Sequence, residues 1–131
     1  MSLALTNAEH QVMDLLWMYD KPLSCAEIVE ASEDKTWKDS YVHSLIKSLS
    51  KKGLVKIEAF ELISRSYARK FTPAMTEAEY IAYLALEEYQ ASPLYIIAAL
   101  LDHIPNADDV TEVIKLAKER RKELILEEDE E

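Results

Sequence analysis

Apolar residues recur at helical spacing from the start of the chain. Residues 6–9 have the spacing of a capping box, in which Thr6 and Glu9 each bond the other's backbone N–H at the first turn of a helix. One face of the helix that follows is apolar and holds Val12, Met13, Leu16 and Trp17. Because Pro22 suits a turn, we expect this helix to end near Asp20.

A second capping box at residues 24–27 predicts a short helix with Ile28 and Val29 facing inward. A third helix is predicted over residues 39–52, and Gly53 follows it at the position where helices favour a left-handed residue. The inner face of the third helix holds Val42, Leu45, Ile46 and Leu49. The opposite strip holds Ser40, Ser44, Lys47 and Lys51, and it is flanked by Tyr41, His43 and Ser48.

Strand periodicity replaces helical periodicity after Gly53. Residues 54–58 alternate between apolar and polar side chains, and residues 66–71 form a second segment of strand character before Pro73. We therefore expect a β-hairpin whose tip is a loop within residues 60–65.

The rest of the chain is predicted to be helical and is unusually apolar. Another capping box lies at residues 76–79, a break falls at Ser92-Pro93, a final helix starts near Asn106, and an acidic tail at residues 127–131 is expected to fray. The apolar residues that cover more than one helix face include Tyr80, Ile81, Leu84, Leu94, Ile97, Leu100 and Leu101. So short a region rarely buries so much alone, which favours a second copy in a two-fold dimer. The alternative is a compact monomer in which these helices fold onto the N-terminal domain.

These elements predict a mainly α fold with a small β wing. Residues 1–73 are predicted to form a winged helix-turn-helix DNA-binding domain, and residues 74–131 a helical dimerisation domain that ends in the acidic tail.

Charge changes this picture, because the net charge of −10 at first argues against nucleic acid. The distribution reverses that impression. Residues 35–73 hold nine Lys and Arg against three Asp and Glu, whereas both flanks are acidic. Basic charge is thus concentrated on the third helix and the hairpin, which favours double-stranded DNA as a partner over a chance solvated patch.

Composition limits other chemistry. Cys25 is the only cysteine and the three histidines are far apart in sequence, so we expect neither a disulfide nor a bound metal. The single glycine leaves no glycine-rich phosphate loop, and we expect no cofactor. The longest apolar run, residues 94–101, is too short for a membrane span, and a signal-peptide pattern is lacking, so a soluble cytoplasmic protein is expected.

A winged helix places its third helix in the major groove of DNA. On this hypothesis the residues that face base edges are Ser40, Tyr41, His43 and Ser44. The cations that meet phosphates are Lys47, Lys51 and Lys52 of the helix and Arg65, Arg69 and Lys70 of the wing. The helix dipole favours cations such as Lys51 and Lys52 at the C-terminal end of any helix, so these two alone are weak evidence for DNA binding. The evidence lies in the combination of all these residues.

The stretch from Trp37 to Leu54, WKDSYVHSLIKSLSKKGL, resembles the recognition-helix signature of the penicillinase repressor family, which includes methicillin-resistance and copper-responsive repressors. Residues 5–17, 22–29 and 66–73 are similar to that family as well, the last to its returning wing strand. The resemblance implies a dimeric repressor on a palindromic operator. It also implies, for antibiotic-responsive members, an upstream membrane sensor protease whose signal leads to repressor cleavage.

The chain departs from these relatives at several positions. It has no cysteine in its C-terminal half, so copper sensing through a cysteine cluster is not expected, and it lacks the Asn-Phe pair associated with cleavage. His43, Tyr41 and Ser48 stand where the family has other side chains, so the operator sequence does not follow from the resemblance.

Two other function classes compete with a repressor. A winged-helix module for protein–protein contacts, without specific DNA binding, would fit the acidic net charge, but it need not gather its cations on one helix and one hairpin. An enzyme would need an acid, base or nucleophile that converge, and the acids here lie where helix caps and solvated faces would put them. We therefore expect a repressor and not an enzyme.

Overall fold

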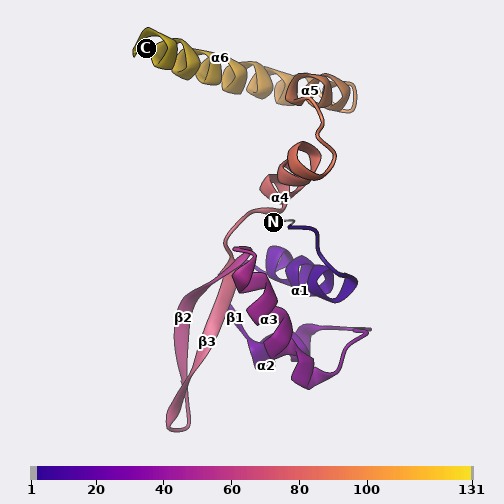
Figure 1. Ribbon diagram of the computed structural model, residues 1–131, viewed down its shortest axis with the longest axis vertical. Coiled ribbons are helices and arrows are strands. Elements are labelled where there is room, and N and C mark those ends of the chain that lie inside the picture. Colours follow the sequence, from indigo (N-terminus) through magenta and orange to yellow (C-terminus); the bar gives the residue numbers. More distant parts are fainter. Residues whose placement is uncertain (1–2, 131) are drawn as a thin grey trace. The chain divides into compact units, whose positions relative to one another are not determined.

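The computed structural model describes residues 3–130, which fall into two compact units, one up to Gln90 and one from Ala91. The first unit contains, in order, α1 (Asn7–Met18), β1 (Leu23–Ser24), α2 (Cys25–Ala31), the 3₁₀ turn η1 (Asp39–Tyr41), α3 (Val42–Lys51), β2 (Val55–Ile63), β3 (Ser66–Pro73), α4 (Glu77–Tyr83) and the π-helical turn η2 (Leu84–Glu88) (Figure 1). The second unit contains α5 (Pro93–Leu101) and α6 (Ala107–Glu130). This confirms a mainly helical fold with a small β wing and a helical C-terminal region.

Local sequence signals set the helix starts. All three predicted capping boxes are formed, with the hydroxyl accepting from the third backbone N–H and the glutamate accepting from the cap N–H. The pairs are Thr6 with Glu9, Ser24 with Glu27, and Thr76 with Glu79. Helix α1 ends at Met18, slightly before the predicted end at Asp20.

The predicted third helix has two parts. Its first turn is η1, and the α-helical hydrogen bonding begins only at Val42. Gly53 ends the helix with φ +76°, its N–H donating to Ser50 O (3.0 Å) while the Leu54 N–H donates to Leu49 O (2.9 Å). These two bonds form a Schellman motif, which confirms the predicted role of Gly53.

The three strands form one antiparallel sheet in the order β1-β3-β2. Glu58 is the extra residue of a β-bulge between Ile57 and Ala59, and it increases the twist of the hairpin. The turn between β2 and β3 falls at Ser64 and Arg65, inside the predicted range for the tip.

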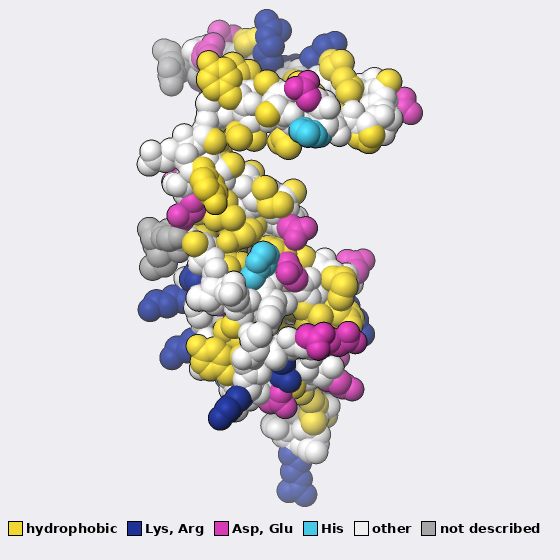
Figure 2. Space-filling model, turned by 90° about the vertical axis from the view of Figure 1, so that its right-hand side faces the viewer, with side chains coloured by type: hydrophobic (Ala, Val, Ile, Leu, Met, Phe, Trp, Pro, Cys, Tyr) yellow, Lys and Arg dark blue, Asp and Glu magenta, His cyan; other side chains and the backbone are white. Residues whose placement is uncertain are grey.

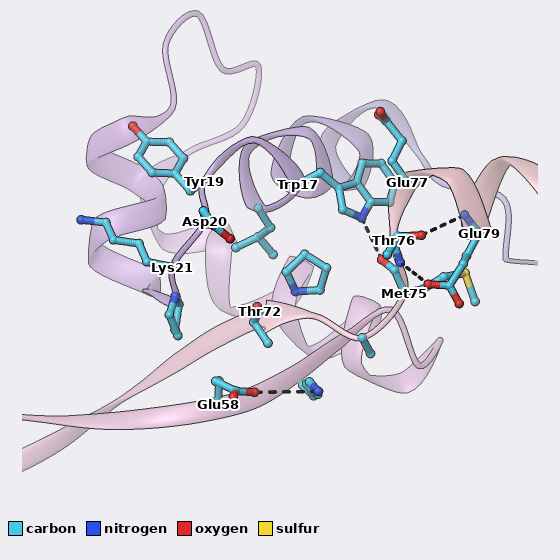
Figure 3. Close-up of a pocket in the computed structure, with 15 residues that line it drawn as sticks. Trp17, Tyr19, Asp20, Lys21, Glu58, Thr72, Met75, Thr76, Glu77 and Glu79 are labelled. Carbon is cyan, nitrogen blue, oxygen red and sulfur yellow. Dashed lines mark hydrogen bonds and ion pairs between the residues drawn. The ribbon is translucent and has the colours of Figure 1, made fainter. Parts of the chain in front are cut away.

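Helix α4 packs within the first unit. The indole Nε1 of Trp17 donates to Met75 O (2.9 Å), just before the capping box of α4 (Figure 3). The ring centroids of Trp17 and Tyr80 lie 5.6 Å apart, and the Tyr80 hydroxyl donates to Leu3 O (3.1 Å). Tyr80 is therefore buried by its own chain, which corrects its placement on an open dimerisation face. The compact units divide after Gln90 and not at residue 73; a functional boundary at residue 73 stays a prediction.

Helix α6 is longer than expected. It begins after Asn106, whose Oδ1 accepts from Asp109 N (2.8 Å), and it continues to Glu130. The acidic segment predicted to fray is thus helical through its last described residue. Leu, Glu and Lys, which have high helix propensity, are frequent along α6 as a whole, and this explains the difference. No helix within residues 3–130 is both long and apolar enough to cross a membrane.

Candidate nucleic-acid interface

The two sides of α3 have opposite characters. The side that holds Val42, Leu45, Ile46 and Leu49 is buried in the core of the first unit. Every residue predicted to face DNA from this segment, except Lys52, is exposed: Ser40, Tyr41, His43, Ser44, Lys47 and Lys51. Ser40 and Tyr41 belong to η1, so they precede the α-helical turns and do not follow the helical spacing from which their direction was predicted.

The hairpin of β2 and β3 forms the wing. Its turn extends past the helices of the first unit, at the lower end of Figure 1. Ser64 adopts a left-handed backbone conformation with φ +56°, and Arg65 follows it, exposed, at the tip. Figure 2 shows Lys and Arg side chains projecting at this lower end.

A groove of about 850 Å³ lies between α3 and the wing. From α3 it is lined by His43, Lys47 and Ser50, and from β3 by Tyr67 and Arg69. Cys25 and Ala26, the first residues of α2, and the buried side chain of Phe71 also line it. The groove brings one predicted base-facing residue, one cation of the helix and one cation of the wing to a common surface.

Only part of the basic block is available to a ligand. Ion pairs within the chain engage Lys35 with Asp39 (2.7 Å), Lys52 with Glu9 (2.8 Å), Lys56 with Glu58 (3.8 Å), and Lys70 with both Glu27 (3.1 Å) and Glu61 (2.7 Å). Among residues 3–130, the block's cations outside such pairs are Lys38, Lys47, Lys51, Arg65 and Arg69. Four of these five are the predicted DNA contacts on α3 and the wing.

Lys52 has a structural role. Its ammonium donates to Glu9 Oε1 (2.8 Å) and to Ala4 O (3.0 Å), which joins the C-terminal end of α3 to the start of α1. Glu9 also accepts from Thr6 N (2.9 Å) and from Ser48 Oγ (2.7 Å). Burial alone would raise the pKa of Glu9, but the bonds from Lys52, Thr6 and Ser48 lower it to about 2. We therefore remove Lys52 from the predicted phosphate contacts.

Lys70 is also held by its own chain. Hydrogen bonds to Glu61 and Glu27 raise the pKa of its ammonium, so the charge is retained but is balanced by two carboxylates. Lys70 thereby ties β3 to α2 and to the neighbouring strand. It contributes less to a positive surface than its place in the sequence suggests.

The wing also carries an apolar surface that the sequence did not predict. Leu62 lies opposite Tyr67 in the hairpin, and Phe60 opposite Arg69, so all four side chains share one face. Leu62, Tyr67 and Phe60 are each more than half exposed. Strand periodicity predicted the hairpin, but it could not show how far the hairpin extends beyond the core and leaves this face uncovered.

Three helices, a three-stranded sheet and a cationic groove between α3 and the hairpin define a winged-helix protein of the helix-turn-helix class. The model of a family described as penicillinase repressor matches residues 5–119, and the chain belongs to this family. It is a family of DNA-binding transcriptional repressors and not of enzymes. A comparison with curated proteins found no match.

Proposed function

We propose that the protein represses transcription as a cytoplasmic homodimer bound to a palindromic operator, with α3 in the major groove. The observation that carries this proposal is that only some of the cations in the basic block, residues 35–73, form ion pairs with carboxylates of the chain. The cations of α3 and the wing that border the groove are outside ion pairs in the described chain, whereas Lys52 and Lys70, which serve the fold, are within them.

The roles on DNA follow from position. Ser40, Tyr41, His43 and Ser44 lie at the N-terminal end of the recognition segment, where this class of protein contacts base edges. Lys47 and Lys51, one turn apart on the exposed side of α3, contact phosphates, and Arg65 and Arg69 do so from the wing. Each phosphate neutralised releases counterions, so each adds about 0.9 to the slope of log affinity against log salt.

The second unit supports the homodimer. Leu94, Ile97 and Leu100 are each more than half exposed, and Leu101 is about 38% exposed. Figure 2 shows hydrophobic side chains at the surface of this unit, in the upper part of the view. Apolar surface of this extent is typical of an interface, and a two-fold dimer matches the symmetry of a palindromic site. Of the other residues predicted for dimerisation, Ile81 is exposed, whereas Leu84 packs partly against the first unit's core.

A fluorescence titration tests the proposal. The protein is titrated with a duplex from its own upstream region and with a scrambled duplex, at about 50 and 200 mM salt. We expect tighter binding to the upstream duplex, with two protomers per site and a steep loss of affinity at higher salt. Equal, weak binding to both duplexes would contradict sequence-specific repression at that site.

Two kinds of substitution separate affinity from specificity. Lys47→Ala and Lys51→Ala should each weaken binding to every duplex and reduce the salt slope by about one. Ser44→Ala should change the preference between duplexes more than the overall affinity. Lys115→Ala, which removes a cation from α6, is the matched control and should change neither. If Lys47→Ala left affinity for DNA unaltered, the assignment of α3 to the major groove would be wrong.

A further inference from the structure

The groove between α3 and the wing has apolar walls that contact with DNA phosphates does not explain. On the wing side its lining includes Ile57, Ile63 and Tyr67, which are 45%, 49% and 68% exposed. Phosphates are held by cations and polar hydrogen-bond donors, so they need no apolar wall. Exposed apolar side chains in a hollow of about 850 Å³ are typical of a small-molecule site, since such sites occupy about 300–1,000 Å³.

The lining of this groove carries no negative charge, although the chain holds 25 Asp and Glu against 15 Lys and Arg. Among the described residues that line it, none is Asp or Glu, and two are the cations Lys47 and Arg69. Neither cation takes part in an ion pair within residues 3–130. The groove therefore offers positive charge beside apolar surface, and charge complementarity selects an anion as its occupant.

The charge of Arg69 reaches the first residue of α2. Burial raises the pKa of the Cys25 thiol, and the positive charge of Arg69 opposes that rise. The guanidinium is therefore close enough to the half-buried Cys25 to influence it, while the thiol stays neutral and adds no negative charge to the groove. A guanidinium so placed is suited to hold a carboxylate through two parallel hydrogen bonds.

We propose that the groove binds a small aromatic carboxylate and that this ligand releases the protein from its operator. The carboxylate pairs with Arg69 and Lys47, and the rings of Tyr67 and Phe71 in the lining favour an aromatic body over an aliphatic one. The same two cations contact phosphates in the proposed DNA complex, so ligand and DNA exclude each other. The competition rests on the proposed repressor function, whereas binding of the carboxylate does not.

Binding of 2-naphthoate to the full-length, ¹⁵N-labelled protein, followed by amide chemical shifts, tests the site. This probe carries a carboxylate on a rigid aromatic body, and a ligand of its size should bind with a Kd of about 1 mM. Saturable shifts should concentrate in residues 24–26, 43–50 and 63–71, which border the groove. The uncharged 2-naphthylmethanol should bind about tenfold more weakly. Shifts that are absent, or confined to α5 and α6, overturn the proposal.

Paired substitutions separate the charged contact from the apolar one. Arg69→Ala should weaken 2-naphthoate binding about tenfold, whereas Lys38→Ala, which removes an exposed cation that does not line the groove, should not. Ile63→Ser should weaken binding about threefold, whereas Leu62→Ser should not, because Leu62 is exposed but does not line the groove. The amide spectrum of each variant shows whether it is folded. Equal affinity of Arg69→Ala and Lys38→Ala overturns the proposal.

A DNA titration measures the competition. At about ten times its Kd, 2-naphthoate should raise the apparent Kd for the upstream duplex about tenfold. Acetate at the same concentration supplies equal ionic strength without a ring, and it should have a much smaller effect. Groove binding that leaves the affinity for DNA unchanged overturns the proposed release from the operator.

The two titrations also distinguish this inference from the proposed repressor function. A protein that prefers the upstream duplex but does not bind 2-naphthoate refutes the ligand site and leaves the repressor intact. A protein that binds 2-naphthoate in the groove but prefers neither duplex refutes the repressor, and with it the competition, while the ligand site stands.

Discussion

At the residue scale, Glu9 joins the start of α1 to the end of α3. Its carboxylate is almost completely buried, and it accepts hydrogen bonds from Thr6, Ser48 and Lys52. A buried charge is tolerated only when its partners compensate for the loss of water, and here a cation and two neutral donors do so. Glu9 therefore fixes the position of the recognition helix from the side that faces away from the groove.

Substitution of Glu9 by Gln tests this role. The folded pKa of about 2 lies below the ordinary value of 4.5, so the carboxylate contributes stability that is present above about pH 4.5 and is lost as the pH falls through 2. At pH 7 the Glu9→Gln variant should lose about 3 kcal/mol of unfolding free energy. Urea denaturation at pH 7 and at pH 3 measures this loss, which should be smaller at pH 3. The exposed Glu30→Gln is the control, and a similar loss in both variants would contradict a special role for Glu9.

Gly53 presents a simpler test of backbone conformation. Its φ is +76°, and a Cβ added there would meet no atom within 4 Å, so only the left-handed backbone opposes a side chain. We expect Gly53→Ala to cost about 1 kcal/mol of stability and Gly53→Asn to cost less, since Asn tolerates this conformation better. Thermal unfolding of both variants gives the comparison. Equal stability of Gly53→Ala and the parent protein would show that the helix end adapts.

At the scale of elements, sequence motifs predicted the helix ends correctly where the hydrogen bonds that stabilise those ends join residues close in sequence. The capping boxes and the glycine that closes α3 involve residues up to five apart, so the sequence contains both partners of each bond. The start of α3 was predicted less well. Its first turn is 3₁₀, and nothing in the apolar spacing distinguishes a 3₁₀ turn from the first turn of an α-helix.

The wing tip allows a test that leaves the fold untouched. Arg65 is exposed and follows the turn residue Ser64, so Arg65→Ala should not change the unfolding free energy. It should weaken DNA binding and reduce the salt slope by about one, because it removes one cation from the interface. Arg65→Lys retains the charge and is the matched control for a phosphate contact. If both variants lost affinity equally, the tip would depend on the shape of the guanidinium and not on charge alone.

At the scale of the whole molecule, the sequence predicted the fold class and the location of the basic surface, but not which cations are free. Lys52 and Lys70 belong to the same basic block as Lys47 and Arg69, yet their partners Glu9 and Glu27 are more than 40 residues away in the chain. Periodicity carries no information about such pairs. For the same reason it placed Tyr80 on a dimer surface, although Trp17 and Leu3 cover it within the first unit.

A substitution in α5 tests whether repression depends on dimerisation. Leu100 is 59% exposed and lines the groove between α5 and α6, whereas its neighbour Ala99 does not line it. Leu100→Asp places a charge on apolar surface that is to be buried in the dimer, so the dimer should dissociate. Ala99→Asp adds the same charge one residue away and should leave the protein dimeric.

Loss of the dimer should also weaken binding to the operator. Two linked domains on one palindrome gain affinity because the second binds at a high effective concentration, so Leu100→Asp should weaken operator binding about 100-fold or more. The groove residues of the first unit are unaltered in this variant, so weak binding to a single half-site should persist with its salt dependence. Sedimentation and titration of the same sample relate the two effects. A monomeric Leu100→Asp protein that bound the full operator as tightly as the parent would show that the recognition surface of one copy is sufficient.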